Sequence, residues 1–458
     1  MLTNKVVRLP LLLLAGTVVA LSAGVPGVRA AGVSSGTTTP SPQVQAAQAL
    51  RDSLGLRSDL AFVTISETAV NQPASGFVRS ELIGIPVTSS EEAELIRRDT
   101  IAQALPAINA RFANQPGYIQ AWLNQAGGGT ADVSVTAAFS TPSSELQAML
   151  PAGTTLNVHV FPYSRAELDS VVQRLNKDAF TLRGEGIHIE HWGLEVQTGQ
   201  VQVGLNPVTS VASAAATLRA NYGGGMLDIV PSTPAAGAAS RTAITGRVYG
   251  GAYIAFASSQ EHCTAANSSI GQFGYFVISA GHCGNGNNVV RGSFSGPSIG
   301  TALTNGYYGN VNSTTNCDCL AAGPIPSSLA TNEVIIPTFP GLYSYTRLPS
   351  YLEFPVGETV CATGDQWAVT HNGDLSCGQI TSASTSVFIS DIYGNDDELQ
   401  DAFSFAAGSE GGDSGSPIGH GSTFMGILDT QPVSGSVYAS KSYYIQGATG
   451  TQPIFNNP

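Results

Sequence analysis

The chain has 458 residues, with 19 Lys or Arg against 32 Asp or Glu, and its formal net charge is −13. A surface so poor in cations does not follow a phosphate backbone, so nucleic acid is not an expected partner. The length exceeds the roughly 100–200 residues of a typical domain, which predicts more than one domain.

The first 30 residues have the composition of an export signal. Lys5 and Arg8 give a basic start, residues 11–21 form an apolar run, and residues 28–30 (Val-Arg-Ala) place a small residue at both recognition positions of a cleavage site. That run is too short for a membrane span, and no later run is long enough either. We therefore expect a signal peptide at 1–30 and a secreted, extracellular protein that does not bind membranes and can form disulfides.

Residues 31–243 show alternating helical and strand patterns, after a flexible leader at 31–42 rich in Gly, Ser, Thr and Pro. Ser89-x-x-Glu92 is a capping-box start for a helix that we expect to end near Leu105, before Pro106. The other predicted helices cover 43–56, 164–177 and 208–221, and the predicted strands cover 157–161, 193–196, 201–205 and 226–230. The segment contains no cysteine and no catalytic pattern, so we interpret it as a separate α+β module.

The composition changes after residue 230. A stretch rich in Pro, Ala and Ser at 231–243 is typical of a linker, which few contacts should cross. From residue 244 to residue 458, short apolar runs alternate with Gly- and Asn-rich turns, which predicts an all-β domain. The runs lie at 253–257, 275–279, 334–336, 387–389, 424–428 and 442–445.

Residues 411–417, Gly-Gly-Asp-Ser-Gly-Ser-Pro, carry the strongest chemical signal of the chain. A serine hydroxyl is a poor nucleophile unless a base removes its proton as it attacks. Glycines on both sides of Ser414 allow a tight turn, and the amides of Gly412 and Ser414 could converge on the oxyanion that forms. Short Gly/Ser/Asp runs also occur in ordinary turns, so the interpretation depends on finding a base.

His282 is the candidate base. It lies in Ser-Ala-Gly-His-Cys, directly after the apolar run 275–278, which is typical of a buried strand. A base at the end of a strand is held rigidly, which suits proton transfer. Three other histidines are interpreted as surface or loop residues: His262, His371 and His420.

Both segments resemble those of chymotrypsin-like serine proteases. Residues 411–417 resemble the nucleophile loop of that family, and residues 279–283 resemble its Thr-Ala-x-His-Cys. Ser416 is a departure, because the family usually has glycine there. The resemblance implies that 244–458 is an all-β, two-barrel, chymotrypsin-like catalytic domain.

The same resemblance implies the acid of the triad. The order along the chain in that family is His, Asp, Ser, and Asp318 is the one aspartate between His282 and Cys361. Its implied role is to accept the imidazole N–H, so that the other ring nitrogen faces Ser414. The alternative is an ordinary aspartate in a turn.

The resemblance further implies pairings for four of the six cysteines. The contexts Val-Cys-x-x-Gly and Ser-Cys-Gly look like the streptogrisin and alpha-lytic protease branch of the family. The implied disulfides are Cys263–Cys283 and Cys361–Cys377. Cys317 and Cys319 flank Asp318 and are left open as free thiols, an unusual bridge or intermolecular partners.

By the same resemblance, two segments form the pocket for the substrate residue before the scissile bond. They are Gly408, Ser409, Glu410 and Gly411, and then Asp429, Thr430 and Gln431. Gly408 stands where trypsin-like members have an aspartate, so cleavage after Arg or Lys is disfavoured. Glu410 and Asp429 could still supply negative charge, and Asp429 replaces the serine usual at its position. We expect a large apolar residue to be preferred.

The α+β module resembles the N-terminal pro-region of alpha-lytic-type proteases. The resemblance lies in residues 47–56, in Phe112, Tyr118 and Trp122, and in the order of helices and strands up to Val230. It implies a pro-domain at 31–243 that assists folding and inhibits the enzyme, because a protease of non-local β pairings folds slowly. The alternative is an unrelated binding domain.

The function implied is that of a secreted serine endopeptidase, made as a zymogen, with protein or peptide substrates. It is expected to be a monomer and to use no metal or cofactor. Two alternatives stay open: a catalytically silent binding protein with the same fold, and an esterase that uses the same triad. An α/β-hydrolase is disfavoured because its order is Ser, acid, His, and His420 follows Ser414 with no acid between them.

Overall fold

The computed structural model describes residues 40–456, which belong to one structural unit, apart from short gaps. The gaps are 71, 73–75, 81, 208–210, 233–246, 257–260, 285–287, 292–295, 306–312, 336–341, 352, 372–374, 391–395 and 433–434. The expected signal peptide and most of the expected linker therefore lie outside the described residues.

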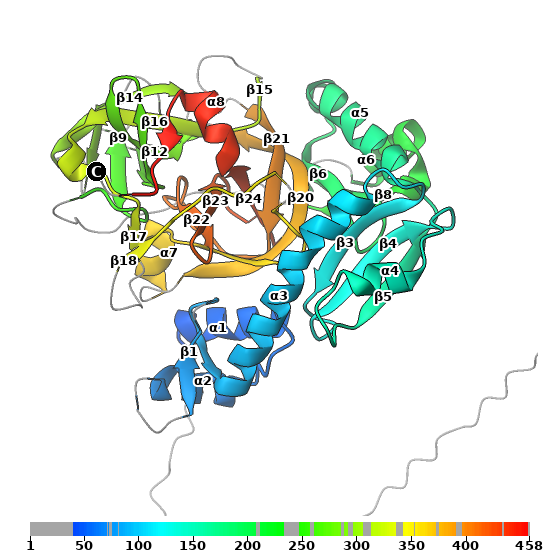
Figure 1. The fold of residues 1–458 in the computed structure, drawn as a ribbon. Coiled ribbons are helices and arrows are strands. Elements are labelled where there is room, and N and C mark those ends of the chain that lie inside the picture. The colour runs from blue at the N-terminus through cyan, green and yellow to red at the C-terminus, as the bar shows by residue number, and fades with distance from the viewer. Residues whose placement is uncertain are drawn as a thin grey trace, which may run out of the picture. The chain divides into compact units, whose positions relative to one another are not determined.

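The module begins with two helices and a small sheet (Figure 1). These elements are α1 (Pro42–Ser53), α2 (Leu60–Ala69), β1 (Phe77–Arg79) and β2 (Pro86–Thr88). The Ser41 side chain accepts a backbone N–H in the first turn of α1, which satisfies one of the donors that a helix start leaves unpaired.

Helix α3 (Ser89–Phe112) is longer than the sequence predicts. Thr88 and Glu91 form its capping box, one residue before the predicted pair. Pro106 lies inside the helix instead of ending it. Helix stability in proteins comes mostly from packing, and the buried stripe continues on both sides of the proline. The stripe contains Leu95, Ile101, Leu105, Ile108 and Phe112.

A three-stranded sheet follows α3. It contains β3 (Tyr118–Asn124), β4 (Thr130–Thr136) and β5 (Leu156–Phe161). Strands β4 and β5 are parallel, and α4 (Ser143–Ala148) lies in the connection between them, as a parallel crossover requires.

The last part of the module confirms the predicted hairpin. Strands β6 (Ile189–Glu195) and β7 (Gln200–Leu205) are antiparallel neighbours. Helix α5 (Arg165–Gly184) precedes them, and α6 (Val211–Tyr222) connects β7 to the parallel strand β8 (Leu227–Pro231).

The C-terminal part is strand-rich, as predicted, and begins with an eight-stranded sheet of order β10-β9-β13-β14-β16-β12-β11-β25. Its strands are β9 (Tyr253–Phe256), β10 (Glu261–Thr264), β11 (Ser268–Gly271), β12 (Gly274–Ala280), β13 (Asn288–Arg291), β14 (Ser298–Asn305), β16 (Cys319–Ile325) and β25 (Gln452–Pro453). Ile254, Phe256, Val277 and Leu320 belong to its buried core.

Six further strands close a ring of antiparallel pairings in the order β19-β20-β21-β24-β23-β22 and back to β19. They are β19 (Thr359–Ala362), β20 (Ser376–Ser390), β21 (Asp396–Phe405), β22 (Pro417–His420), β23 (Thr423–Leu428) and β24 (Val437–Lys441). Such a ring removes the unpaired strand edges that invite association with other chains.

Short elements complete this part. They are β15 (Thr314–Thr315), β17 (Glu333–Ile335), β18 (Leu342–Ser344), α7 (Asp365–Thr370) and α8 (Ile445–Thr449). The apolar run at 442–445 does not form a strand, so this part of the all-β prediction is wrong. A 3-10 turn at Ser442–Tyr444 leads there into α8. Short apolar runs do not distinguish a strand from a buried helical turn. Among the described residues, the structure has no helix of the length and apolar character needed to span a bilayer.

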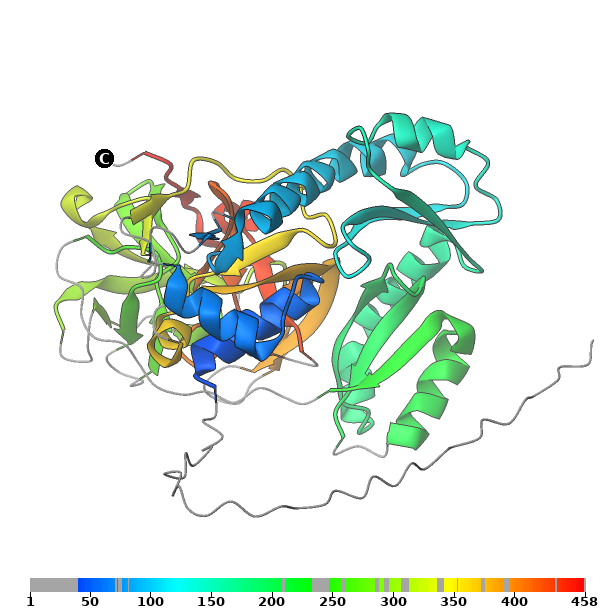
Figure 2. The same ribbon diagram turned by 90° about the horizontal axis from the view of Figure 1, so that it is seen from below.

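The module and the C-terminal part share a sheet. Strand β6 pairs antiparallel with β20, so that Gly193 lies opposite Thr385, and β7 and β8 extend the sheet outward (Figures 1 and 2). A Cβ atom on Gly193 would collide with the Thr385 side chain. Trp192 is fully buried here, against the ring of Phe388. This pairing joins the module to the strand that also carries Cys377.

A second set of contacts lies at the other end of the module. The Leu123 N–H donates to the carbonyl of Val356 at 2.9 Å, and the Gln125 side chain donates to the carbonyl of Gly357 at 3.0 Å. The Gly357 backbone approaches Leu123 so closely that a Cβ would collide with its carbonyl. The module is therefore fitted to the C-terminal part by backbone contacts at two separate places.

A buried ion cluster lies between α3 and the ring of six strands. His420 is the last residue of β22, where the sequence predicts a loop. Its Nε2 lies 2.8 Å from an Asp99 carboxylate oxygen and 3.5 Å from one of Glu358, and its Nδ1–H donates to the Thr359 carbonyl at 2.8 Å. Burial by itself would lower the pKa of His420, but the charges of Glu358 and Asp99 outweigh it and raise the pKa to about 9.

We expect this cluster to hold the module more tightly at pH 6 than at pH 10. A histidine whose pKa rises from 6.5 to about 9 on folding stabilises the fold below pH 6.5, and this contribution, on the order of 3 kcal/mol, is lost as the pH rises through 9. Burial also raises the pKa of Glu358 to about 7. Between pH 4.5 and 7 this carboxyl group is ionised in the unfolded chain but still protonated in the folded one, so the free energy of unfolding falls over this range.

The measurement is thermal unfolding of the full chain at pH 6 and pH 10, with Ser414→Ala as the background. His420→Gln should reduce the difference between the two pH values, whereas the control His188→Gln should leave it unchanged. An equal pH dependence in the His420→Gln variant and its parent would contradict this role of the cluster.

Candidate active site

The three residues proposed as a triad come from separate segments and meet in the structure. His282 Nε2 lies 2.8 Å from Ser414 Oγ, and His282 Nδ1 makes a short hydrogen bond with Asp318 Oδ2. The side chain of Asp318 is fully buried, and that of His282 is 13% exposed. This geometry lets His282 accept the proton of Ser414 while Asp318 fixes the tautomer of the ring.

Strand register brings His282 and Asp318 together. Strand β12 pairs with β16 so that Ala280 lies opposite Cys319. His282 follows β12 after one residue, and Asp318 directly precedes β16, so both lie at the same edge. The backbone N–H of His282 donates to Asp318 Oδ1 at 2.7 Å, and that of Gly281 donates to the Asp318 carbonyl at 3.0 Å.

The disulfides lie around this edge. Cys263–Cys283 ties the turn that carries His282 to β10, and Cys361–Cys377 links β19 to β20, as the resemblance implies. Cys317 and Cys319 bridge each other across Asp318. All six cysteines are therefore paired.

The loop that carries Ser414 is held by Thr264, a residue that sequence reasoning missed. The Thr264 N–H donates to the Ser414 carbonyl and its hydroxyl to the Gly412 carbonyl, both at 2.8 Å. Gly415 has φ of 89°, and a Cβ there would collide with the Thr264 carbonyl and the Ser279 hydroxyl. Thr264 directly follows Cys263, but nothing in its sequence context indicates this contact.

Ser416, the departure from the resemblance, fits inside the loop. Its hydroxyl and its backbone N–H both donate to the carbonyl of Asp413, the latter at 2.8 Å. Ser416 is fully buried, so its hydroxyl closes the turn around Ser414 instead of facing solvent.

Asp413 anchors the other side of the loop. Its Oδ1 accepts the backbone N–H groups of Gln366 and Trp367, at 2.8 and 3.0 Å, and its Oδ2 accepts that of Glu410 at 2.7 Å. The first two belong to the first turn of α7, where a carboxylate is favoured. Burial raises the pKa of Asp413 to about 6. The carboxylate thus ties α7 to the nucleophile loop.

The proposed oxyanion donors lie in this restrained loop. Gly412 has φ of 102°, a conformation that favours glycine. Within the described residues, no acceptor takes the N–H of Gly412 or of Ser414. Thr264 holds the carbonyls of both residues, which restrains the backbone of the loop that carries these amides before a substrate arrives, as electrostatic stabilisation of an oxyanion requires.

The two proposed pocket segments lie side by side. The Ser409 hydroxyl donates to the Thr430 carbonyl at 3.0 Å, while Glu410 accepts the Thr370 hydroxyl at 2.8 Å. Gly408 packs against the ring of Trp367, so closely that a Cβ would collide with it. Gly411 is buried and Gln431 is partly exposed.

Asp429 does not face the pocket segment. The residue is 2% exposed, and its Oδ2 accepts the Ser440 hydroxyl at 2.7 Å. The Ser440 oxygen in turn accepts the backbone N–H of Asp318 at 2.8 Å. Asp429 therefore lies behind the triad acid.

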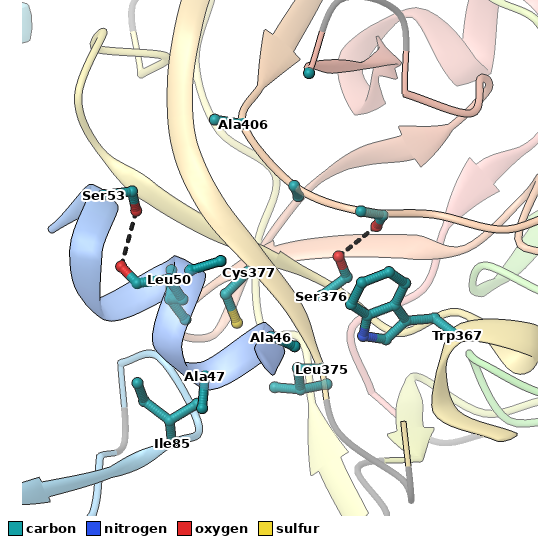
Figure 3. A pocket seen from close by; sticks show the side chains of 14 residues that line it. Ala46, Ala47, Leu50, Ser53, Ile85, Trp367, Leu375, Ser376, Cys377 and Ala406 are labelled. Carbon is teal, nitrogen blue, oxygen red and sulfur yellow. Dashed lines mark hydrogen bonds between the residues drawn. The ribbon is translucent and has the colours of Figure 1, made fainter. Parts of the chain in front are cut away.

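An apolar pocket of about 180 Å³ adjoins Gly408, and α1 of the module covers one side of it (Figure 3). The labelled lining residues are Ala46, Ala47, Leu50, Ser53, Ile85, Trp367, Leu375, Ser376, Cys377 and Ala406. The Ser376 hydroxyl hydrogen-bonds to the carbonyl of Gly408. The module therefore contributes a wall to a pocket that Gly408, a residue of the proposed substrate site, also lines.

One group of described residues has the composition of a metal site. Ligand atoms of Asp99, Glu358 and His420 all lie within 4.8 Å of one another. The Nε2 of His420 is already bonded to Asp99, so the cluster is complete as an ion pair.

Over slightly less than half of its length, the chain is similar to several solved serine proteases. Protease A of Thermobifida fusca shares 22% identity over 46% of this chain and 100% of its own, with a TM-score of 0.36. A chymotrypsin of Cellulomonas bogoriensis shares 20% over 46% of this chain and 100% of its own, with a TM-score of 0.35. An alpha-lytic protease homologue, N4, shares 19% over 45% of this chain and 98% of its own, with a TM-score of 0.35. No protein-family model and no curated protein matches the chain.

Proposed function

We propose that the chain is a secreted serine endopeptidase that is synthesised as a zymogen. The observation that carries this proposal is the unbroken hydrogen-bonded series Asp318–His282–Ser414. A serine hydroxyl bonded to an imidazole, which a buried carboxylate orients, is the arrangement that activates serine as a nucleophile.

In the proposed mechanism, Ser414 Oγ attacks the carbonyl carbon of a peptide bond while His282 Nε2 takes its proton. The N–H groups of Gly412 and Ser414 stabilise the oxyanion. His282 then gives the proton to the leaving amine, which leaves an acyl group on Ser414. Water attacks this ester with His282 again as the base, and the enzyme is restored.

We propose that residues 31–243 act as a pro-region. The pairing of β6 with β20 and the wall that α1 adds to the apolar pocket support this role. The module thus contacts both a long strand of the catalytic part and the surroundings of Gly408. Cleavage after β8 would separate the two chains, whereas their non-covalent contacts would persist until the module is removed.

The proposed substrate preference is a large apolar residue before the scissile bond. Gly408 brings no charge, and the part of the neighbouring pocket that lies outside the module includes the side chains of Trp367, Leu375 and Ala406. The carboxyl of Asp429 is hydrogen-bonded to Ser440, away from the pocket. Glu410 is then the remaining acid in the two pocket segments. A cationic substrate side chain would therefore gain little.

The test is to incubate the purified full chain with a fluorophosphonate probe and with a mixture of peptides, and to identify labelled and cleaved sites by mass spectrometry. We expect the label on Ser414, none in Ser414→Ala, and cleavage after apolar residues. A chain freed of its module that neither labels nor cleaves would be a silent binding protein. Labelling with hydrolysis of esters alone would indicate an esterase.

A further inference from the structure

A second carboxyl group lies behind the triad acid. Asp429 follows β23, and Ser440 lies on the adjacent strand β24 (Figure 1). Asp429 is 2% exposed, and Asp318 is the neighbouring group whose charge acts on it. Two carboxyl groups that interact in a dry interior do not both ionise readily, because each charge disfavours the other.

The hydrogen bonds around Asp429 show where a proton belongs. The Ser440 oxygen accepts the N–H of Asp318, and its single proton goes to Asp429 Oδ2. Asp429 Oδ1 is buried, and within the described residues nothing bonds to it. If Asp429 were ionised, this buried oxygen would carry negative charge without a hydrogen-bond partner, which would destabilise the fold. A proton on Oδ1 would remove this charge and make the oxygen a hydrogen-bond donor, and the carboxylate of Asp318, whose charge acts on Asp429, is the candidate acceptor.

We infer that Asp429 carries a proton at neutral pH and donates it in a hydrogen bond to Asp318, as a positioning residue behind the triad. This inference rests on the proposed function. Burial, and then the charge of Asp318, raise the pKa of Asp429 well above its usual range.

The other ionisable groups on the strands around Asp429 leave this assignment intact. His282 is bonded to Asp318. On β24, Tyr438 is buried with its pKa well above the usual range because of that burial, and Lys441 is bonded to Asp401 at 2.6 Å. Within the described residues, none of these is a cation paired with Asp429, so a charged form of Asp429 would have no counter-ion.

A protonated Asp429 would act on catalysis through Asp318. Its O–H would hold the Asp318 carboxylate in place and withdraw some of its negative charge. That would keep the pKa of His282 low enough for the ring to be a free base at mildly acidic pH. A plain hydroxyl could hold the carboxylate, but a carboxylic acid is a stronger donor.

The first experiment needs no activity. The full chain with Ser414→Ala is labelled with carbon-13 at aspartate carboxyl groups, and the carboxyl signals are followed by NMR from pH 4 to pH 8. We expect one aspartate to stay protonated through pH 7 and its signal to be missing from the chain that also carries Asp429→Asn. Ionisation of every aspartate by pH 7 would overturn the inference, whether or not the chain is a protease.

The second experiment compares two replacements of similar size in the active chain, with turnover normalised to the fluorophosphonate-labelled fraction. Asp429→Asn keeps an N–H donor toward Asp318 and should retain kcat/KM within about threefold. Asp429→Leu removes the donor, and kcat should fall about 10- to 100-fold, with the acid limb of the pH profile moved to higher pH. Equal losses in both variants, or none in Asp429→Leu, would refute the role of the donor.

Discussion

Replacing Ser414 with alanine is expected to lower turnover by about 10⁶-fold, and His282→Ala should cost about as much, because the members of a triad act as a unit. For the same reason, the double variant should be hardly worse than either single one. The structural basis is the 2.8 Å contact between His282 Nε2 and Ser414 Oγ, which is the proposed route for the hydroxyl proton. Without either partner, the remaining group has no way to activate an attack.

Asp318→Asn is the more specific test of the assignment. The amide would present an N–H toward the ring nitrogen that now faces a carboxylate, which favours the wrong tautomer, and turnover should fall about 10⁴-fold with the fold intact. Initial rates on a peptide ester and a peptide amide, normalised to active protein, provide the measurement.

A matched control exists in the module. Asp132 is also fully buried and lies 2.7 Å from a histidine nitrogen, that of His159. Asp132→Asn should leave the turnover of the processed enzyme near that of the wild type. Near-normal rates in Asp318→Asn would show that another residue, or none, orients His282.

The local sequence carries most of the information about the chemistry of the site. Ser414 and His282 stand in short segments whose composition already points to a nucleophile and a base at a strand end. The positions of β12 and of the loop around Ser414 follow from local patterns of apolar residues and glycines. The residues within a few positions along the chain are enough to predict these features.

Features that depend on strand register do not follow from local patterns, and the sequence names Asp318 only through the resemblance to a known protease family. Asp318 is a neighbour of His282 because Ala280 lies opposite Cys319, and a shift of one residue would turn the carboxylate to the other face of the sheet. Thr264 reaches the nucleophile loop across a sequence separation of 148 residues from Gly412. No pattern in a single sequence encodes such a contact.

Several acidic and basic residues are buried in places that the sequence does not predict. Asp429 follows a strand as expected, but its carboxyl is bonded to Ser440 behind the triad. His420, interpreted as a loop residue, ends β22 inside a buried ion cluster. In both cases the direction of the side chain depends on strands far away in the sequence.

The proposed catalytic part alone, Ile244–Pro458, is expected to refold from denaturant with little activity, and to recover most of it when residues 31–242 are added in trans. Its strands are joined by non-local pairings in two large arrangements, so loop-closure entropy is lost long before contacts form, and folding is slow. Strand β6 offers a preformed partner for β20, the longest strand of the ring at 15 residues. The module would thereby lower the barrier without entering the final product.

A variant module separates this mechanism from a general effect of added protein. Gly193→Val should abolish rescue, because a Cβ at this position collides with Thr385 of β20 and prevents the pairing. Gly184→Ala, at the end of α5 with open space around it, should rescue as well as the wild-type module. Recovered activity on a peptide substrate after a fixed refolding time is the measurement. If Ile244–Pro458 recovers equally with no module, the kinetic barrier is absent and residues 31–243 are better explained as a separate binding domain.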